Sequence, residues 1–215
     1  MPFPLIQSLI DFLFPKTASV YDLESMSAGE LTNLLSVPRE TEEALAVFSY
    51  EDAHVREIIW EIKYRKNTTL AKKMAEILYD LIKQELAERT LTENFKHPLL
   101  IPLPMSAERR KERGYNQTEI ICEALVALDT EHLFEYVPNI LIKDRHTQSQ
   151  TKTTSKRERV RNIENSMRVV DAESVRGRSI ILLDDVSTTG ATVKEAKRAL
   201  REAGARKLLA FTIAH

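Results

Sequence analysis

The chain has 215 residues, with 31 Lys and Arg against 32 Asp and Glu, so its formal net charge is −1. Hydrophobic residues make up 43% and charged residues 29%, which is ordinary for a globular protein and argues against a disordered chain or a wholly basic nucleic-acid clamp. The single cysteine, Cys122, excludes a disulfide within the chain and a cysteine-cluster zinc site, and it is consistent with a reducing compartment. We find neither an apolar run long enough for a membrane span nor a signal peptide, and we expect a cytoplasmic protein.

The first 43 residues carry weaker patterns than the rest of the chain. Residues 4–14 (PLIQSLIDFLF) resemble a short amphipathic helix, which either packs on the protein or meets a partner or membrane surface. Residues 15–43 are rich in Ser, Thr, Glu and Pro with little periodicity, and we interpret them as a loop or linker. We therefore divide the chain into an N-terminal region, 1–43, and a main domain, 44–215.

Strand-like and helix-like segments alternate from residue 44 onward. A helix beginning after Asp52 carries Val55, Ile58, Ile59 and Ile62 on one apolar stripe. Further helices are predicted at 69–88, 115–128 and 191–203, and strands at 44–50, 99–103, 139–143, 166–170, 179–183 and 207–213.

The C-terminal segments predict the class of fold. Residues 179–183 (SIILL) are almost wholly apolar, as in a central parallel strand that is covered on both faces. Gly204 follows the last predicted helix, where a left-handed C-terminal cap is expected. Strand, helix and strand with short connections form a βαβ unit, so we predict an α/β fold with a parallel sheet flanked by helices.

The sharpest motif is residues 180–192 (IILLDDVSTTGAT). A buried strand ends in Asp184 and Asp185, and a short hydroxyl-rich loop then opens directly into a helix. Free N–H groups at a helix N-terminus bind anions, and Gly190 lets the backbone approach a phosphate closely. Carboxylates would repel that phosphate, so the pair suits a ligand with a phosphate at one end and hydroxyls at the other, such as a ribose 5-phosphate. The alternative is an ordinary strand–turn–helix with a threonine cap.

This motif is similar to the phosphoribosyl pyrophosphate (PRPP) signature of the type I phosphoribosyltransferases. The resemblance implies that Asp184 and Asp185 act as catalytic residues that hold the ribose hydroxyls. It also implies a 5-phosphate site made of Ser187, Thr188, Thr189, Gly190, Ala191 and Thr192. We expect Mg2+, held mainly by the ligand and water, as Mg2+ usually is.

Two further segments resemble the ComF branch of this family. Residues 113–117 (RGYNQ) follow a Pro-hydrophobic-Pro strand end, and residues 143–162 carry seven basic residues against two acidic ones. We interpret 143–162 as a lid over pyrophosphate, with an exposed nucleic-acid patch or a solvated loop as alternatives. The residues expected to receive pyrophosphate are Arg113, Arg145, Lys152, Lys156, Arg157 and Arg161.

The resemblance covers about residues 44–213, and residues 1–43 depart from it. ComF proteins commonly begin with a four-cysteine zinc finger, but this region has no cysteine, so we expect no zinc and regard 1–43 as a degenerate remnant. The implied function is transfer of phosphoribose from PRPP to an unknown acceptor. The alternative is a non-catalytic accessory factor in DNA uptake, with single-stranded DNA or a competence helicase as partner. A homodimer is also compatible with the resemblance.

Overall fold

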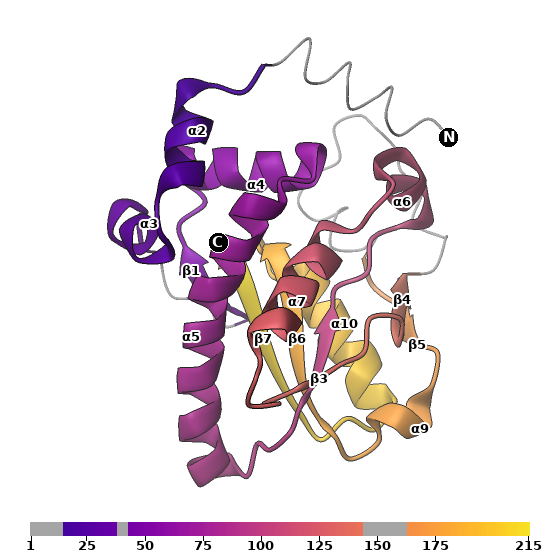
Figure 1. Cartoon of the computed structure of the whole chain (residues 1–215). Helices are drawn as coiled ribbons and strands as arrows, with labels where there is room; N and C mark the ends of the chain where they lie inside the picture. Colours follow the sequence, from indigo (N-terminus) through magenta and orange to yellow (C-terminus); the bar gives the residue numbers. More distant parts are fainter. Residues whose placement is uncertain (1–14, 38–42, 144–162) are drawn as a thin grey trace.

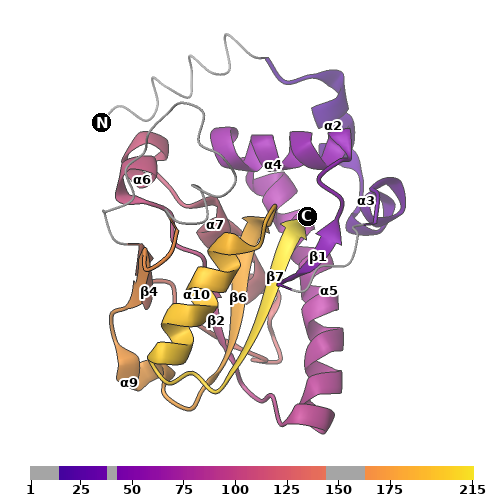
Figure 2. The ribbon, with the colours of Figure 1, turned by 180° about the vertical axis from the view of Figure 1, so that it is seen from behind.

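The computed structural model describes residues 15–37, 43–143 and 163–215, and its centre is a five-stranded parallel sheet in the order β1-β7-β6-β2-β3. Figures 1 and 2 show this sheet from its two faces. The strands are β1 (Leu45–Phe48), β2 (Leu99–Pro102), β3 (Glu135–Tyr136), β6 (Ser179–Val186) and β7 (Lys207–Ala214). The predicted parallel sheet is confirmed, and β3 is an edge strand that sequence patterns did not indicate.

Helices cover both faces of the sheet. One face packs against α4 (Ala53–Arg65), α5 (Thr68–Glu93) and α7 (Gln117–Leu128), and the other against α10 (Ala191–Glu202). Two shorter helices, α6 (Ala107–Arg113) and α9 (Ala172–Val175), lie in the connections. Because side chains of a strand alternate between faces, Ile181 and Leu183 of β6 join the α5–α7 core while Ile180 and Leu182 join the α10 core. Cys122 is fully buried in the α5–α7 core.

Two predicted strands lie outside the parallel sheet. β4 (Leu141–Lys143) and β5 (Met167–Val169) form a separate antiparallel pair. The backbone of Met167 attaches this pair to α10, because its N–H donates to Glu195 Oε1 at 3.1 Å and its carbonyl accepts from Arg198 Nη2 at 3.1 Å. The pair therefore lies beside α10, and its two strands flank residues 144–162 in the sequence.

The interpretation of residues 15–43 as a loop or linker is wrong for much of its length. It contains α2 (Ala18–Ser25) and α3 (Ala28–Leu34). Helix α3 begins with a capping box, in which Ser27 Oγ accepts from the Glu30 N–H and Glu30 accepts from the Ser27 N–H. Buried leucines, Leu23 and Leu31, dock these helices on the α4–α5 core, which supplies the stability that short helices lack alone.

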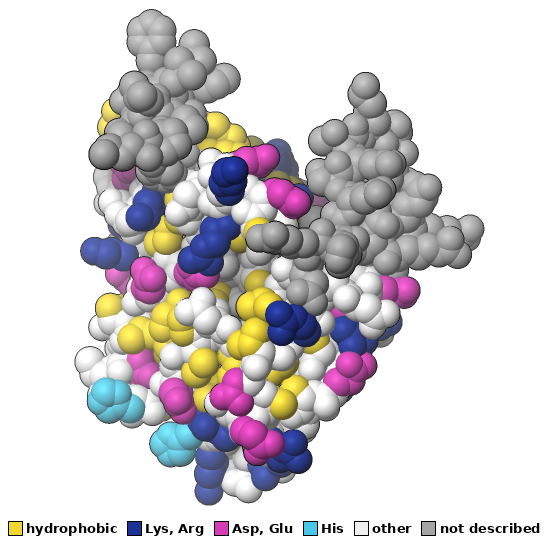
Figure 3. Space-filling view, turned by 90° about the vertical axis from the view of Figure 1, so that its right-hand side faces the viewer, with side chains coloured by type: hydrophobic (Ala, Val, Ile, Leu, Met, Phe, Trp, Pro, Cys, Tyr) yellow, Lys and Arg dark blue, Asp and Glu magenta, His cyan; other side chains and the backbone are white. Residues whose placement is uncertain are grey.

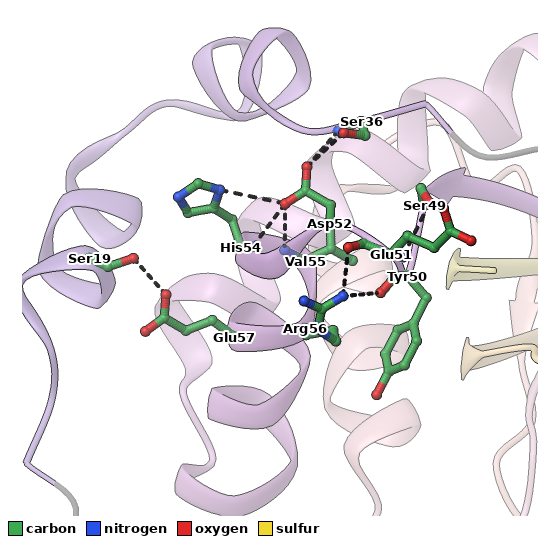
Figure 4. A network of polar contacts seen from close by, with 10 residues as sticks. All are labelled: Ser19, Ser36, Ser49, Tyr50, Glu51, Asp52, His54, Val55, Arg56 and Glu57. Carbon is green, nitrogen blue, oxygen red and sulfur yellow. Dashed lines mark hydrogen bonds and ion pairs between the residues drawn. The ribbon is translucent and has the colours of Figure 1, made fainter.

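Polar contacts tie this N-terminal pair to α4, as Figure 4 shows. Asp52 caps α4 as predicted, accepting from the N–H groups of His54 and Val55, and its second oxygen accepts from the Ser36 N–H at 3.0 Å. Ser19 Oγ donates to Glu57 at 2.6 Å. The predicted helix 4–14 lies outside the described residues, and within the described ones no helix is both long and apolar enough to cross a membrane.

Candidate functional site

A cavity of about 710 Å³ opens at the carboxyl ends of β2 and β6, where ligands bind in open α/β sheets. Asp184 and Asp185 of β6 form its floor, and α4, α6, α7 and β4 contribute side chains to its walls. Among the described residues, four cationic side chains face this cavity: Lys63, Arg109, Arg113 and Lys143. Acidic side chains accompany them on α6, Glu108 and Glu112, so the rim is mixed in charge rather than uniformly basic.

Asp185 is buried and held from the α4–α7 side of the sheet. Lys63 Nζ of α4 lies 2.9 Å from Asp185 Oδ2, and Gln117 Nε2 of α7 donates to the same oxygen at 3.0 Å. Its other oxygen accepts from the Val186 N–H at 2.7 Å. An ion pair and two hydrogen bonds thus hold the Asp185 carboxylate in one orientation.

Asp184 lies in a different environment, because neighbouring residues of a strand point to opposite faces. Its side chain receives the Asp185 N–H at 2.9 Å and stands on the side of Lys143. Burial, followed by the charge of Asp185, raises the pKa of Asp184 well above its ordinary value. The two carboxylates therefore have different neighbours although they are adjacent in sequence.

The predicted phosphate loop runs from Ser187 to the start of α10. Thr188 and Thr192 line the cavity, whereas Ser187 is buried and bonds to the end of β7 through its N–H and the Ala214 carbonyl, 3.0 Å apart. Gly190 has a φ of 69°, a conformation that glycine adopts without strain, and it caps α10 without a side-chain hydrogen bond. The Thr189 hydroxyl accepts from the N–H of Ala191 at 3.4 Å and is turned to the helix start rather than to the cavity.

The 113–117 segment joins the α4 and α7 sides of the cavity. The Tyr115 hydroxyl is 3.0 Å from the Ile62 carbonyl and 2.7 Å from that of Lys63, and it accepts from the Lys66 N–H at 2.9 Å. Burial raises the pKa of Tyr115 to about 12. Tyr115 therefore fixes the C-terminal turn of α4, which carries the lysine that pairs with Asp185.

Arg113 is the one predicted pyrophosphate-receiving residue that the structure describes. Its guanidinium lies 5.1 Å from the centre of the Tyr64 ring and donates to Gln117 Oε1, on the cavity wall. The other predicted members lie outside the described residues: Arg145, Lys152, Lys156, Arg157 and Arg161.

Several cavity residues were not among the predicted ones. Lys63, Tyr50, Arg109 and Lys143 all face the cavity. Burial, and then the charge of Arg109, lowers the pKa of Lys143. Lys143 belongs to the basic segment 143–162 that was predicted as a lid, although it was not named among the pyrophosphate-receiving residues. Lys63 belongs to an amphipathic helix whose pattern says nothing about Asp185.

Comparisons with known proteins show which proteins this chain resembles in sequence. The family described as "Phosphoribosyl transferase domain" matches residues 128–214, which include β6, the loop after it, α10 and β7. Competence protein F of Haemophilus influenzae is 29% identical over 160 residues, covering 73% of this chain and 66% of that protein. Competence protein ComFC of Bacillus subtilis is 33% identical over 119 residues, covering 55% of this chain and 45% of that one. The DNA utilization protein YhgH of Escherichia coli K12 is 28% identical over 149 residues, covering 69% and 61%.

Solved structures match at low identity. Glutamine PRPP amidotransferase from B. subtilis has 15% identity and a TM-score of 0.39, with 72% of this chain and 30% of that chain covered. Hypoxanthine phosphoribosyl transferase of Trypanosoma cruzi has 14% identity and a TM-score of 0.38, with 81% and 71% covered. The chain spans 45 to 66% of the length of the three curated relatives. In sequence, the chain is similar to ComF-type competence proteins, and its residues 128–214 match the phosphoribosyl transferase domain.

Proposed function

We propose that this protein binds PRPP and transfers its phosphoribosyl group to an acceptor that the sequence does not identify. The observation that carries the proposal is the meeting of two unlike carboxylates, Asp184 and Asp185, with the 187–192 loop on one cavity. The loop offers N–H groups at the start of α10 to the 5-phosphate. The carboxylates accept hydrogen bonds from the ribose hydroxyls, a few residues away along the same strand.

The side chains present supply positioning and charge rather than a nucleophile. Loss of pyrophosphate leaves cationic character on the sugar ring, and preorganised carboxylates stabilise such charge. Asp185 pairs with Lys63, and Arg113 and Lys143 face the same cavity and can donate hydrogen bonds to the departing pyrophosphate. Holding the sugar and its acceptor together in one cavity lowers the entropic part of the barrier.

The donor set fits Mg2+ in the way we expect from its chemistry. The described residues contain no cluster of three or more His, Cys, Asp or Glu that could hold a metal alone. Mg2+ often takes one or two carboxylates together with substrate phosphates and water, and Asp184 and Asp185 are available for that. When bound, the ion would neutralise charge on the pyrophosphate. No zinc enters the proposal.

Isothermal titration with PRPP, in the presence and absence of Mg2+, tests the binding step. We expect binding that Asp185→Asn weakens at least about tenfold, since a carboxylate that accepts charged or hydroxyl donors contributes about 1.5–3 kcal/mol. Asp171→Asn is the matched control, because Asp171 caps α9 away from the cavity and asparagine caps equally well. Unchanged PRPP affinity in Asp185→Asn would contradict the proposal.

Release of pyrophosphate from PRPP against a panel of nucleobases and amines tests the transfer step. The second candidate function is a PRPP- or DNA-associated accessory factor without turnover, which the names of the relatives, competence and DNA utilization proteins, favour. Binding without release selects this function. Single-stranded DNA retention that falls steeply with salt would add a nucleic-acid partner.

The surface bears on that second function. Lys and Arg side chains are interspersed with Asp and Glu over the described part of the face in Figure 3. No continuous basic track is seen among the described residues on that face, and we expect DNA retention to depend on the basic segment 143–162. The proposal also includes a helicase partner, a homodimer and a cytoplasmic location. Retention by a helicase and light scattering of the purified protein test the first two, and cell fractionation tests the third.

A further inference from the structure

The end of β7 contacts the phosphate loop through His215. Its imidazole Nδ1 lies 2.5 Å from the Ser187 carbonyl oxygen. A carbonyl oxygen only accepts hydrogen bonds, so Nδ1 carries the proton and donates. This contact joins the residue after the β7 strand to the first residue of the predicted 5-phosphate site.

The backbone of His215 is itself fixed on both sides. Its N–H donates to the Phe48 carbonyl at 3.1 Å, and its carbonyl accepts from the Tyr50 N–H at 2.8 Å. These two bonds continue the pairing of β1 with β7 beyond the strands. The imidazole is therefore presented from a rigid part of the sheet, not from a loose loop.

The geometry of a trans peptide gives this contact a consequence at the cavity. The C=O and N–H of one peptide unit point in opposite directions, and no cis peptide bond occurs in the described residues. Holding the Ser187 carbonyl toward His215 consequently turns the Thr188 N–H away from His215. Thr188 lines the cavity, and its N–H has no acceptor among the described residues.

We propose that His215 is a positioning residue that orients the Thr188 N–H toward the 5-phosphate of the sugar ligand. This inference rests on the proposed function for the identity of the ligand. Ser187 is bonded at both ends of its backbone, by Ala214 at its N–H and by His215 at its carbonyl, so the first turn of the loop is set before ligand arrives. Loss of the imidazole leaves the Ser187 peptide free to rotate, and ordering it then opposes binding.

The test compares three substitutions that differ in where they place a donor. His215→Asn puts an amide N–H near the position of Nδ1, His215→Gln puts it near the position of Nε2, and His215→Leu has none. Binding of ribose 5-phosphate and of inorganic phosphate is followed by titration and by the amide NMR resonance of Thr188. His54→Leu is the control, since the exposed His54 imidazole lies on α4 beside Asp52.

We expect His215→Leu and His215→Gln to bind ribose 5-phosphate about 5- to 10-fold more weakly, which corresponds to one net hydrogen bond. His215→Asn should stay within about twofold of the original protein, a rescue that a merely structural role would not produce. The Thr188 resonance should shift on addition of phosphate in the original protein and in His215→Asn only. Equal thermal unfolding of the Asn and Gln variants shows that the comparison reports the loop rather than the fold.

The outcomes separate this inference from the proposed function. If the original protein binds both phosphates and His215→Leu binds them equally well, the positioning role is overturned and the proposed function stands. If phosphate binding depends on His215 but PRPP binds no better than phosphate, the positioning role stands and the proposed function fails. If the original protein binds neither phosphate, both are overturned.

Discussion

Replacement of Lys63 by methionine should destabilise the protein by removing the partner of Asp185. Methionine keeps the unbranched stem and the helix propensity of lysine but not its charge. The two side chains are 22% and 8% exposed and their charged atoms lie 2.9 Å apart, so the pair stands between a surface and a buried ion pair. Surface pairs contribute about 0.2–1 kcal/mol, whereas breaking a buried pair costs about 3–5 kcal/mol.

The expected cost of Lys63→Met lies between the value for a surface pair and the value for a buried pair, and nearer to the surface value. Asp185 keeps its hydrogen bonds from Gln117 and from the Val186 N–H, so it is not left bare when the lysine is removed. We therefore expect a loss of about 1–2 kcal/mol in the free energy of unfolding. For a chain of this length this lowers the melting temperature by about 2–8 °C.

Urea unfolding of a double-mutant cycle measures the pair itself. The cycle comprises Lys63→Met, Asp185→Asn and the combination, and we expect a coupling energy of about 1–2 kcal/mol. Lys72→Met on α5 is the matched control, because Lys72 is exposed and has no ion pair among the described residues. A coupling below about 0.3 kcal/mol, the usual error of additivity, would refute the assignment of Lys63 as the counterion of Asp185.

Three further changes test the remainder of the site. Gly190→Ala should lower the free energy of unfolding in urea by about 1–3 kcal/mol, because alanine is strained at a φ of 69° and its Cβ would lie 2.7 Å from Cγ of Glu43. The control is Gly29→Ala inside α3, where the space around the Cβ is open, and it should raise the free energy of unfolding by a few tenths of a kcal/mol. Tyr115→Phe should cost about 1 kcal/mol and weaken PRPP binding, since the C-terminal turn of α4 loses the contacts of the Tyr115 hydroxyl with the Lys66 N–H and the Ile62 and Lys63 carbonyls; equal affinity would contradict a role in holding the α4 wall. Asp184→Asn should remove one part of the pH dependence of stability. The raised pKa means that the folded protein binds the proton of Asp184 more tightly, so the contribution of Asp184 to stability is full below about pH 4 and is lost as the pH rises through the raised pKa. The difference between the unfolding free energies of the original protein and Asp184→Asn, measured from about pH 4 to 9, should show this loss.

The parallel sheet was predictable because its central strand consists almost entirely of apolar residues, as a strand buried on both faces must. Residues 179–183 are apolar on both faces, and the structure places helices on both. The same apolar pattern identified 139–143 and 166–170 as strands but not their antiparallel pairing with each other. Alternation reports that a segment is extended and half-buried, and it does not name the neighbour.

The N-terminal helices have a capping signal in their sequence that the loop-like composition of the region outweighed in our prediction. Ser, Thr, Glu and Pro suggested a loop over 15–43, yet Ser27 and Glu30 have the spacing of a capping box. Each helix is short and has few buried side chains, so apolar periodicity over one or two turns is too brief to detect. Tertiary contact with α4 and α5, not local preference, completes them.

The part of the candidate site that lies in one contiguous segment was predictable, whereas the contacts between residues distant in sequence were not. The acidic pair and the loop after it are contiguous, so strand-end and helix-start chemistry was readable from 180–192. Lys63 and Gln117 reach Asp185 from helices far away in sequence, and His215 reaches Ser187 across the ends of β6 and β7. Such contacts depend on which elements the fold brings together, and periodicity within one element carries no trace of them.

Strand geometry explains why two adjacent aspartates are not redundant. Consecutive side chains of β6 must point to opposite faces, so one acid meets α4 and α7 while the other meets the β4 side. Lys63 and Gln117 contact Asp185, whereas burial and then the charge of Asp185 raise the pKa of Asp184, an effect that the charge of Lys63 partly offsets. The two acids therefore have different partners, and this division follows from the alternation of side chains along a single strand.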